Sequence, residues 1–287
     1  APYTGLQVAL VDLRCDAHIE VVGPSDDCKV FVVDPISGAR LATIQPGSVV
    51  CTSAGCSFEV VAGPINPPIV ADVDKDGKLD IIVANTAAVV ARFSVDLAAS
   101  TNSSLVFQKV WEHRYNAYQS FTTMDAAPIV ADLNGDGTLE TIVVSEEVGV
   151  FAIRPDGSTL WQVPAIGGHA TPSVRDLDND GKPEVVVARD DGKIMALVGA
   201  TGAQKWIFDA SQFVSPASIP MAPTLADGNG DGKADVICAA RDAHDATNFA
   251  NDHIMIFVLN HAGQLLWKAQ PSWAAPLSHT RPIVVTV

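Results

Sequence analysis

The sequence predicts an all-β protein built from repeated units of four strands each. Three features carry this prediction: a short acidic motif recurs along the 287 residues, apolar and β-branched runs flank each copy, and a Gly-containing hairpin pattern follows it. No stretch shows apolar residues recurring every 3.6 positions, so we expect almost no helix.

The acidic motif is the element that sets the period. Its copies begin at Asp72, Asp132, Asp176 and Asp227, so they are spaced by 60, 44 and 51 residues. The first copy reads Pro68-Ile-Val-Ala-Asp72-Val-Asp-Lys-Asp-Gly-Lys-Leu-Asp80. Such a period is the size of one four-stranded blade, which predicts a β-propeller.

Two further segments extend the repeat. A degenerate copy at Asp12 to Glu20 lies 60 residues before the first full one, and Pro282-Ile-Val-Val-Thr-Val287 repeats the opening strand of a sixth unit. The single domain of residues 1–287 is therefore expected to hold five units and one opening strand, as part of a larger propeller, an unusual propeller, or an arc closed by further blades or a partner chain beyond Val287. The expected blade units span about residues 7–60, 61–120, 121–166, 167–215, 216–276 and, in part, 277–287.

The second half of each unit reads as a hairpin. Strand, Gly-containing turn and strand follow one another in 29–41, 150–161, 194–206 and 256–267. Trp161, Trp206 and Trp267 recur at one place in these hairpins. We expect these three indoles to pack between neighbouring blades.

Composition limits the partners. Hydrophobic residues make up 48% of the chain, and the net charge is −15. An acidic protein repels nucleic acid and anionic membrane surfaces, so neither is expected as a partner. No apolar run approaches the roughly 20 residues of a membrane helix, so we expect no membrane insertion. The first residues lack a signal-peptide pattern, as in a mature secreted protein or a cytosolic one.

The five cysteines allow two local disulfides. Cys15 could pair with Cys28 and Cys51 with Cys56, which would leave Cys238 alone in an apolar strand. Such pairs fit an oxidising compartment, whereas five reduced thiols remain the alternative.

The nine-residue acidic loop has the donor pattern of a calcium site. Acids or amides at positions 1, 3 and 5 can turn inward, glycine at position 6 permits the bend, and an acid at position 9 closes the shell. The carbonyl at position 7 is expected to add a ligand. The predicted ligands are Asp72, Asp74, Asp76, Lys78 and Asp80; Asp132, Asn134, Asp136, Thr138 and Glu140; Asp176, Asp178, Asp180, Lys182 and Glu184; and Asp227, Asn229, Asp231, Lys233 and Asp235.

We expect about four calcium ions, one per full loop. Magnesium fits less well because it demands a compact octahedron. A helix–loop–helix calcium site is disfavoured because β-branched runs flank the loops, and four solvated acidic turns without metal are the remaining alternative. In the degenerate copy Arg14 stands at a ligand position and Ala17 replaces glycine, so we expect no metal there and Arg14 in the place of the cation.

The stretch from Ala127 to Glu140 resembles an FG-GAP or VCBS repeat, the unit of the integrin α-chain propeller. The calcium loops match this family position by position, whereas its Phe-Gly element is not evident. The resemblance covers nearly the whole chain and implies an extracellular propeller, usually of seven blades, that serves adhesion, glycan binding or assembly. A minority of such propellers belong to enzymes such as polysaccharide lyases.

Two insertions are candidate ligand-binding segments. Residues 111–124 concentrate His113, Arg114, Tyr115, Tyr118 and Phe121, and residues 241–253 hold His244 and His253. Aromatic and Arg side chains favour recognition surfaces, with blade packing and a solvated loop as the respective alternatives. No nucleophile, zinc-protease or nucleotide motif occurs. The sequence thus favours a secreted calcium-binding module for a protein or glycan ligand, with part of a polysaccharide-acting enzyme or a purely structural domain as alternatives.

Overall fold

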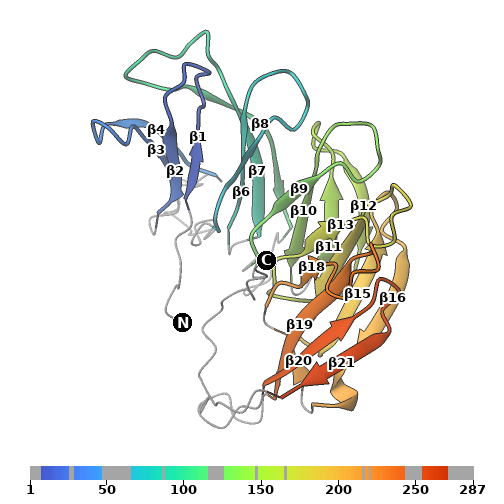
Figure 1. Cartoon of the computed structure of the whole chain (residues 1–287). Coiled ribbons are helices and arrows are strands. Elements are labelled where there is room, and N and C mark those ends of the chain that lie inside the picture. The colour runs from blue at the N-terminus through green and yellow to red at the C-terminus, as the bar shows by residue number, and fades with distance from the viewer. Residues whose placement is uncertain are drawn as a thin grey trace, which may run out of the picture.

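The computed structural model describes residues 8–25, 29–46, 66–85, 88–115, 126–145, 148–164, 167–214, 217–219, 221–242 and 254–270. Within them the chain forms five antiparallel sheets that follow one another along an arc (Figure 1). The one helical element of the described part is a three-residue 3-10 turn, Ala210–Gln212. The all-β prediction is therefore confirmed.

Each sheet is called a blade and numbered along the chain. Blade 1 comprises β1 (Ala9–Val11), β2 (Glu20–Pro24), β3 (Val30–Val33) and β4 (Arg40–Ile44). Blade 2 comprises β5 (Ile69–Ala71), β6 (Asp80–Ala84), β7 (Val89–Val95) and β8 (Phe107–Arg114). Blade 3 comprises β9 (Ile129–Ala131), β10 (Glu140–Ser145), β11 (Gly149–Ile153) and β12 (Thr159–Val163).

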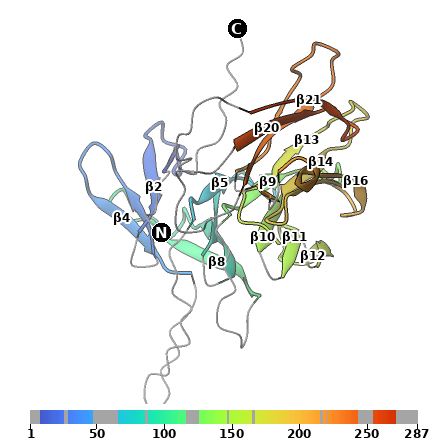
Figure 2. The same ribbon diagram turned by 90° about the horizontal axis from the view of Figure 1, so that it is seen from below.

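The last two blades follow the same order. Blade 4 comprises β13 (Ser173–Arg175), β14 (Glu184–Ala188), β15 (Lys193–Val198) and β16 (Gln204–Asp209). Blade 5 comprises β17 (Ala217–Ser218), β18 (Thr224–Ala226), β19 (Asp235–Asp242), β20 (Ile254–Leu259) and β21 (Leu265–Ala269), with β17 and β18 both paired to β19. β18 and β19 correspond to the first and second strands of the other blades, and β17 is an additional short strand. Figure 2 shows blade 1 and the last strands of blade 5 at opposite ends of the arc.

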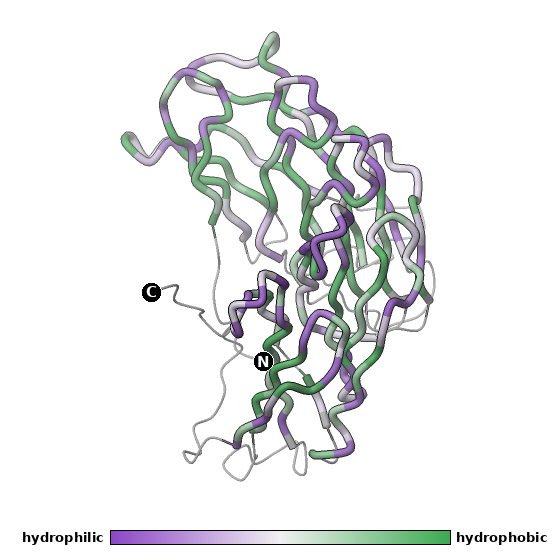
Figure 3. The backbone as a smooth tube through the Cα atoms, turned by 45° about the vertical axis from the view of Figure 1, so that its right-hand side comes forward, coloured by the Kyte–Doolittle hydropathy of each residue, from purple (hydrophilic) through white to green (hydrophobic). Residues whose placement is uncertain are grey.

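The strands are buried according to their place in the blade. The second and third strands of blades 2, 3 and 4 are buried along nearly their whole length, as in β10 and β11, whereas the fourth strands β8 and β21 are exposed or half-buried throughout. Strands covered on both faces need continuous apolar runs rather than alternation, and Figure 3 shows apolar colour along the strands and hydrophilic colour at many loops.

The core lies between blades rather than inside them. One cluster joins blades 1 and 2, another blades 2 and 3, a third blades 3 and 4, and the last blades 4 and 5. The first strands lie on the inner side of the arc, where β1 contacts β5 and β5 contacts β9. A small apolar pocket of about 210 Å³ is lined by residues from these three strands and the segments before them, including Ala9, Ile69 and Ile129.

Tryptophan side chains connect successive blades. The indole Nε1 atoms of Trp111, Trp161 and Trp206 donate to carbonyls in the hairpin turn of the next blade, at 2.9, 2.6 and 2.9 Å. A glycine with φ between 71° and 88° lies against each ring, and a Cβ there would approach the indole to 2.9 Å or less. The expected packing between blades is thus confirmed for Trp161 and Trp206.

Two expectations need correction. Trp267, which we expected to pack like the other two, is 52% exposed, because no described blade follows blade 5. Trp111 to Arg114 is the end of strand β8 rather than part of an inserted loop, because these residues pair with β7. The expected opening strand of a sixth unit, residues 282–287, lies outside the described residues.

Candidate metal sites

The acidic loops connect the first and second strands of the five blades, at residues 12–20, 72–80, 132–140, 176–184 and 227–235. Each is named here by its blade, and its residues are counted from position 1 to position 9. The position 9 acid is the first residue of the second strand in every blade. Sheet pairing therefore fixes one end of each loop.

Backbone hydrogen bonds shape all five loops alike. The position 9 carboxylate accepts from the position 2 amide at 2.8–3.2 Å. The position 1 carboxylate accepts from the position 6 amide at 2.8–3.0 Å. The position 5 carboxylate accepts from the position 7 amide at 2.7–3.0 Å. Each loop therefore folds around its own carboxylates, and these amide donors offset part of the repulsion between the carboxylates.

Positions 4 and 6 both adopt positive φ in every loop. Position 6 is glycine in four loops and Ala17, with φ 67°, in blade 1. Position 4 is also left-handed, and its occupants are Cys15, Lys75, Gly135, Asn179 and Gly230. The sequence pointed to the bend at position 6, but the second bend was missed because its residue type varies.

The position 9 acids are the buried charges of these loops. Glu20, Asp80, Glu140, Glu184 and Asp235 are at most 2% exposed. Burial raises the pKa of Glu140 and Asp235, and the nearby acids of their loops raise it further. Burial also raises the pKa of Asp80, against the opposing effect of Arg92. A buried carboxylate needs a cation or several donors to remain ionised.

In blades 2 and 4 a basic side chain reaches into the loop. Arg92 of β7 donates through Nη2 to Asp74 and, at 2.9 Å, to Asp80. Lys205 of β16 lies 2.8 Å from Asp178 and 2.6 Å from Glu184. Burial lowers the pKa of Lys205, but these two carboxylates outweigh it and the pKa is raised, so the ammonium stays charged.

The loops of blades 3 and 5 use a neutral amide instead. Asn134 Nδ2 donates to Asp136 at 2.9 Å and to Glu140 at 3.2 Å. Asn229 Nδ2 donates to Asp231 at 3.2 Å and to Asp235 at 3.4 Å. The buried acid thus faces a charged side chain in the loops of blades 2 and 4 and a neutral amide in those of blades 3 and 5.

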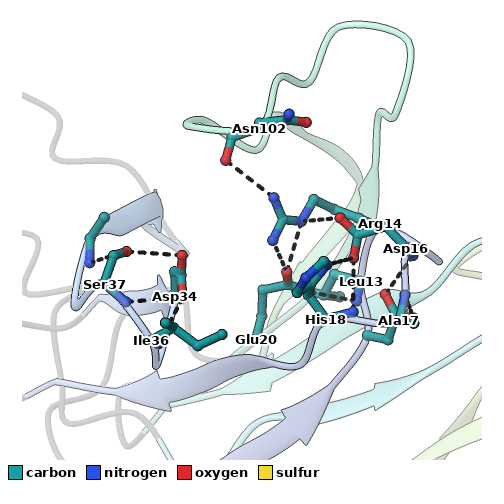
Figure 4. A network of polar contacts seen from close by, with 12 residues as sticks. Leu13, Arg14, Asp16, Ala17, His18, Glu20, Asp34, Ile36, Ser37 and Asn102 are labelled. Atoms are coloured by element: carbon teal, nitrogen blue, oxygen red, sulfur yellow. Dashed lines mark hydrogen bonds and ion pairs between the residues drawn. The ribbon is translucent and has the colours of Figure 1, made fainter.

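The degenerate loop of blade 1 carries its base at position 3. Arg14 contacts Glu20 through Nε at 2.8 Å and Nη2 at 2.6 Å, lies 3.4 Å from Asp16, and donates to the Asn102 carbonyl (Figure 4). The expected position of Arg14 among the acids of this loop is confirmed.

The chemistry of the donor sets fits calcium, because carboxylate and amide oxygens are the ligands this ion prefers. The structure brings positions 1, 3 and 9 together in two loops: oxygens of Asp72, Asp74 and Asp80, and of Asp176, Asp178 and Glu184, lie within 4.8 Å of one another. The position 5 acids are turned toward the position 7 amides, and the position 7 carbonyl ligands, Lys78, Thr138, Lys182 and Lys233, stay predictions.

The candidate ligand residues that the structure describes lie at the joint between blades 2 and 3. His113 Nε2 is 2.6 Å from the Gly157 carbonyl, the centroid of the Tyr115 ring lies 4.1 Å from that of Phe151 with the rings tilted by 38°, and burial raises the pKa of Tyr115. Arg114 is partly exposed and pairs with Glu112 at 2.8 Å. Tyr118, Phe121, His244 and His253 lie outside the described residues, so their ligand role stays a prediction.

The predicted disulfides are not confirmed. Cys15 is exposed and Cys238 buried, and both thiols are free. Cys28, Cys51 and Cys56 lie outside the described residues. Burial raises the pKa of the Cys238 thiol.

Comparison with known proteins supports the repeat and the fold. Residues 72–143 and 176–238 match the FG-GAP-like repeat. The chain is therefore a β-propeller-type protein that contains FG-GAP-like repeats, as the resemblance predicted.

Individual relatives are more distant. The chain is 32% identical over 90 residues to the outer membrane protein assembly factor BamB of Burkholderia pseudomallei (strain K96243), which is 31% of this chain and 22% of that protein. It thus spans about a fifth of the curated relative that it matches.

Two solved structures share the fold. The Saccharomyces cerevisiae protein Sqt1 has a TM-score of 0.50 at 11% identity, over 88% of this chain and 72% of that one. A europium-containing methanol dehydrogenase has a TM-score of 0.50 at 12% identity, over 92% and 61%. At such identities the likeness shows the fold alone. No helix in the described part of the chain is long and apolar enough to span a membrane.

The sequence analysis missed two basic residues that contact the loops from strands β7 and β16. Arg92 was detectable as a charged residue inside the apolar run Val89–Val95. Lys205 gave no signal, because it reads as an ordinary polar residue on an outer strand. The spatial link from strand to loop exists only in the folded blade.

Proposed function

We propose that this chain is a calcium-stabilised binding module of the propeller type, located at the cell surface or in the extracellular space. Its ligand is a protein or a glycan, held by loops at the rim of the blades. The observation that carries the proposal is the nine-residue oxygen-rich loop, repeated with one hydrogen-bond pattern between the first two strands of successive blades.

Calcium has a structural role in this proposal. Loops of neighbouring blades are hydrogen-bonded to each other, from the Leu139 amide to the Val73 carbonyl at 2.8 Å and from the Ala234 amide to the Leu177 carbonyl at 2.9 Å. An ion in such a loop would stabilise the blade and its neighbour together, because only the folded loop assembles the ligands.

A protein ligand is favoured over a glycan. The relative with 32% identity is an assembly factor for outer membrane proteins, although the match covers only 90 residues. Assembly implies protein contacts, and the same kind of contact is what we propose here. No described feature favours the polysaccharide-lyase alternative.

Calcium titration of chelator-stripped protein tests the metal part. We expect uptake of two to four ions by calorimetry and a clear rise in melting temperature. Asp136→Asn and Asp231→Asn should each remove one ion, whereas Glu112→Gln, an acid on β8 outside the loops, should remove none. Protein that takes up no calcium and gains no stability would refute the proposal.

A glycan array combined with hydrolysis and lyase assays tests the ligand part. Stable binding of a glycan without turnover identifies a glycan module. Turnover of a glycan without lasting binding would indicate an enzyme rather than a binding module. Absence of both supports the protein ligand.

A further inference from the structure

Every acidic loop buries one carboxylate at position 9, and the five loops compensate this charge in two ways. In blades 1, 2 and 4 a basic side chain contacts the buried acid: Arg14, Arg92 or Lys205. In blades 3 and 5 the side-chain donor is the neutral amide of Asn134 or Asn229. A buried charge is stable only when it is paired or well hydrogen-bonded.

The arginine of blade 2 is specific to this blade and is not a residue that recurs in the other blades. Arg92 is 2% exposed. It pairs across the sheet with Ile82, which lies two residues after the position 9 acid of this blade. The equivalent partners in the other full-motif blades are small or apolar: Ala152, Ala196 and Val258. Its Nη1 also donates to the Pro155 carbonyl of blade 3 at 2.7 Å, which fixes the guanidinium in place.

The lysine of blade 4 repeats the arrangement from another strand. Lys205 precedes Trp206 on β16, and the residues before the equivalent Trp161 and Trp267 are Leu160 and Leu266. Its ammonium lies between Asp178 and Glu184, the acids of positions 3 and 9. Arg92 likewise bridges positions 3 and 9 in its loop.

The two loops that receive a basic side chain also hold one more carboxylate than the two that do not. Position 3 is aspartate in the two loops that receive a basic side chain and asparagine in the two that do not. The carboxylates at positions 1, 3, 5 and 9 therefore number four in the loops of blades 2 and 4 and three in those of blades 3 and 5, so Arg92 and Lys205 each offset the one extra carboxylate of their loop. Lys75 approaches Gly137 of the blade 3 loop, but among the described residues no ion pair joins it to the acids there.

We propose that Arg92 and Lys205 take the place of calcium in the loops of blades 2 and 4, as Arg14 does in blade 1, so that the loops of blades 3 and 5 alone bind calcium. This rests on the proposed calcium function and reduces the expected four ions to two. A calcium ion in either of the other loops would face a fixed positive charge that already contacts two of its ligands.

Two observations favour a competing arrangement. Carboxylate oxygens of positions 1, 3 and 9 lie within 4.8 Å of one another in the loops of blades 2 and 4. Asp74 Oδ1, Asp80 Oδ1 and Asp178 Oδ1 are buried and accept no hydrogen bond. Calcium bound to these oxygens, with the base on the opposite oxygens, would fill all four loops. The ion count separates the two arrangements.

The experiment is native mass spectrometry of the full chelator-stripped chain with added calcium chloride, supported by calorimetry. We expect two ions. Asp136→Asn and Asp231→Asn should each lower the count to one, whereas the matched substitutions Asp76→Asn and Asp180→Asn should leave two. Four ions, lost one by one in all four variants, would overturn the inference and keep the proposed function. Zero ions would overturn both.

Removal of the base tests its role directly. Lys205→Met keeps the aliphatic stem of a side chain that is 26% exposed, and it should raise the count from two to three. Lys109→Met, at an exposed lysine of β8 that pairs with Glu112, should leave two. An unchanged count in Lys205→Met, with folding verified by its melting temperature in chelator, would contradict the substitution of calcium by lysine.

Discussion

At the scale of single residues, the acidic loop depends on two left-handed positions. Glycine satisfies both in the loops of blades 3 and 5, whereas blade 1 places Cys15 at φ 55° and Ala17 at φ 67°. A side chain with a Cβ in this region costs about 1–2 kcal/mol. The blade 1 loop keeps the shape of the others because Asp12 and Asp16 accept the same backbone hydrogen bonds.

Ala17→Gly should therefore stabilise the protein. The strain removed exceeds the conformational entropy that glycine adds to the unfolded chain, so we expect a net gain of about 0.5–1 kcal/mol. Denaturant unfolding measures the change. The control, Ala269→Gly on the exposed strand β21, should destabilise by a similar amount, and a loss of stability in Ala17→Gly would contradict the strain.

The buried acid of blade 3 should make stability depend on pH when calcium is removed. Burial raises the pKa of Glu140 above its ordinary value of 4.5. Its contribution to stability is therefore fully present below that value and is lost as the pH rises through the raised pKa. In chelator, the melting temperature of the wild type should fall relative to Glu140→Gln between acidic and neutral pH. Parallel pH profiles of the two proteins would show that Glu140 titrates normally.

At the scale of elements, the outer strand of one blade joins the hairpin turn of the next. Trp161 is 7% exposed, its Nε1 donates to the Gly199 carbonyl, and its ring covers Gly202. Glycine meets two requirements at Gly202: the turn needs a positive φ, and the indole ring lies where a Cβ would otherwise be. Trp267 has the same place in blade 5 but is half exposed.

The two tryptophans should differ strongly in their contribution to stability. Trp161→Ala removes a buried ring and its hydrogen bond, and we expect a loss of about 3–5 kcal/mol. Trp267→Ala should cost about 1 kcal/mol or less, because an exposed side chain loses little on truncation. Chemical unfolding of both variants gives the comparison. Equal losses would mean that Trp267 is buried in solution.

At the scale of the whole molecule, neighbouring blades stabilise one another through the interfaces between them. The apolar clusters lie between blades, and the acidic loops are hydrogen-bonded in pairs. A repeat protein of this kind gains stability from each unit and each interface between units. Calcium bound in one loop, as we propose, would therefore stabilise the junction with the neighbouring blade as well as its own blade.

Hydrogen exchange should reveal this local effect. Removal of calcium should increase exchange in peptides that contain the amides of Leu139 and Ala234, which donate to the loops of the preceding blades. The loop of blade 1, which holds Arg14, should exchange equally with and without calcium. Peptide-level mass spectrometry measures both. A uniform change along the chain would indicate global rather than local stabilisation.

The sequence by itself determined the all-β class, the four-stranded units and the acidic loops. The reason is physical: strand pairing, tight turns and oxygen ligands each require particular residue types at short spacing, as in the run from Ala127 to Glu140. Only the tertiary structure decided that Arg92 and Lys205 reach into two of the loops, that His113 and Tyr115 lie between blades, and that Trp267 is exposed. These outcomes depend on which strands and blades become neighbours, and contacts between residues 12 to 44 positions apart leave no local pattern in the chain.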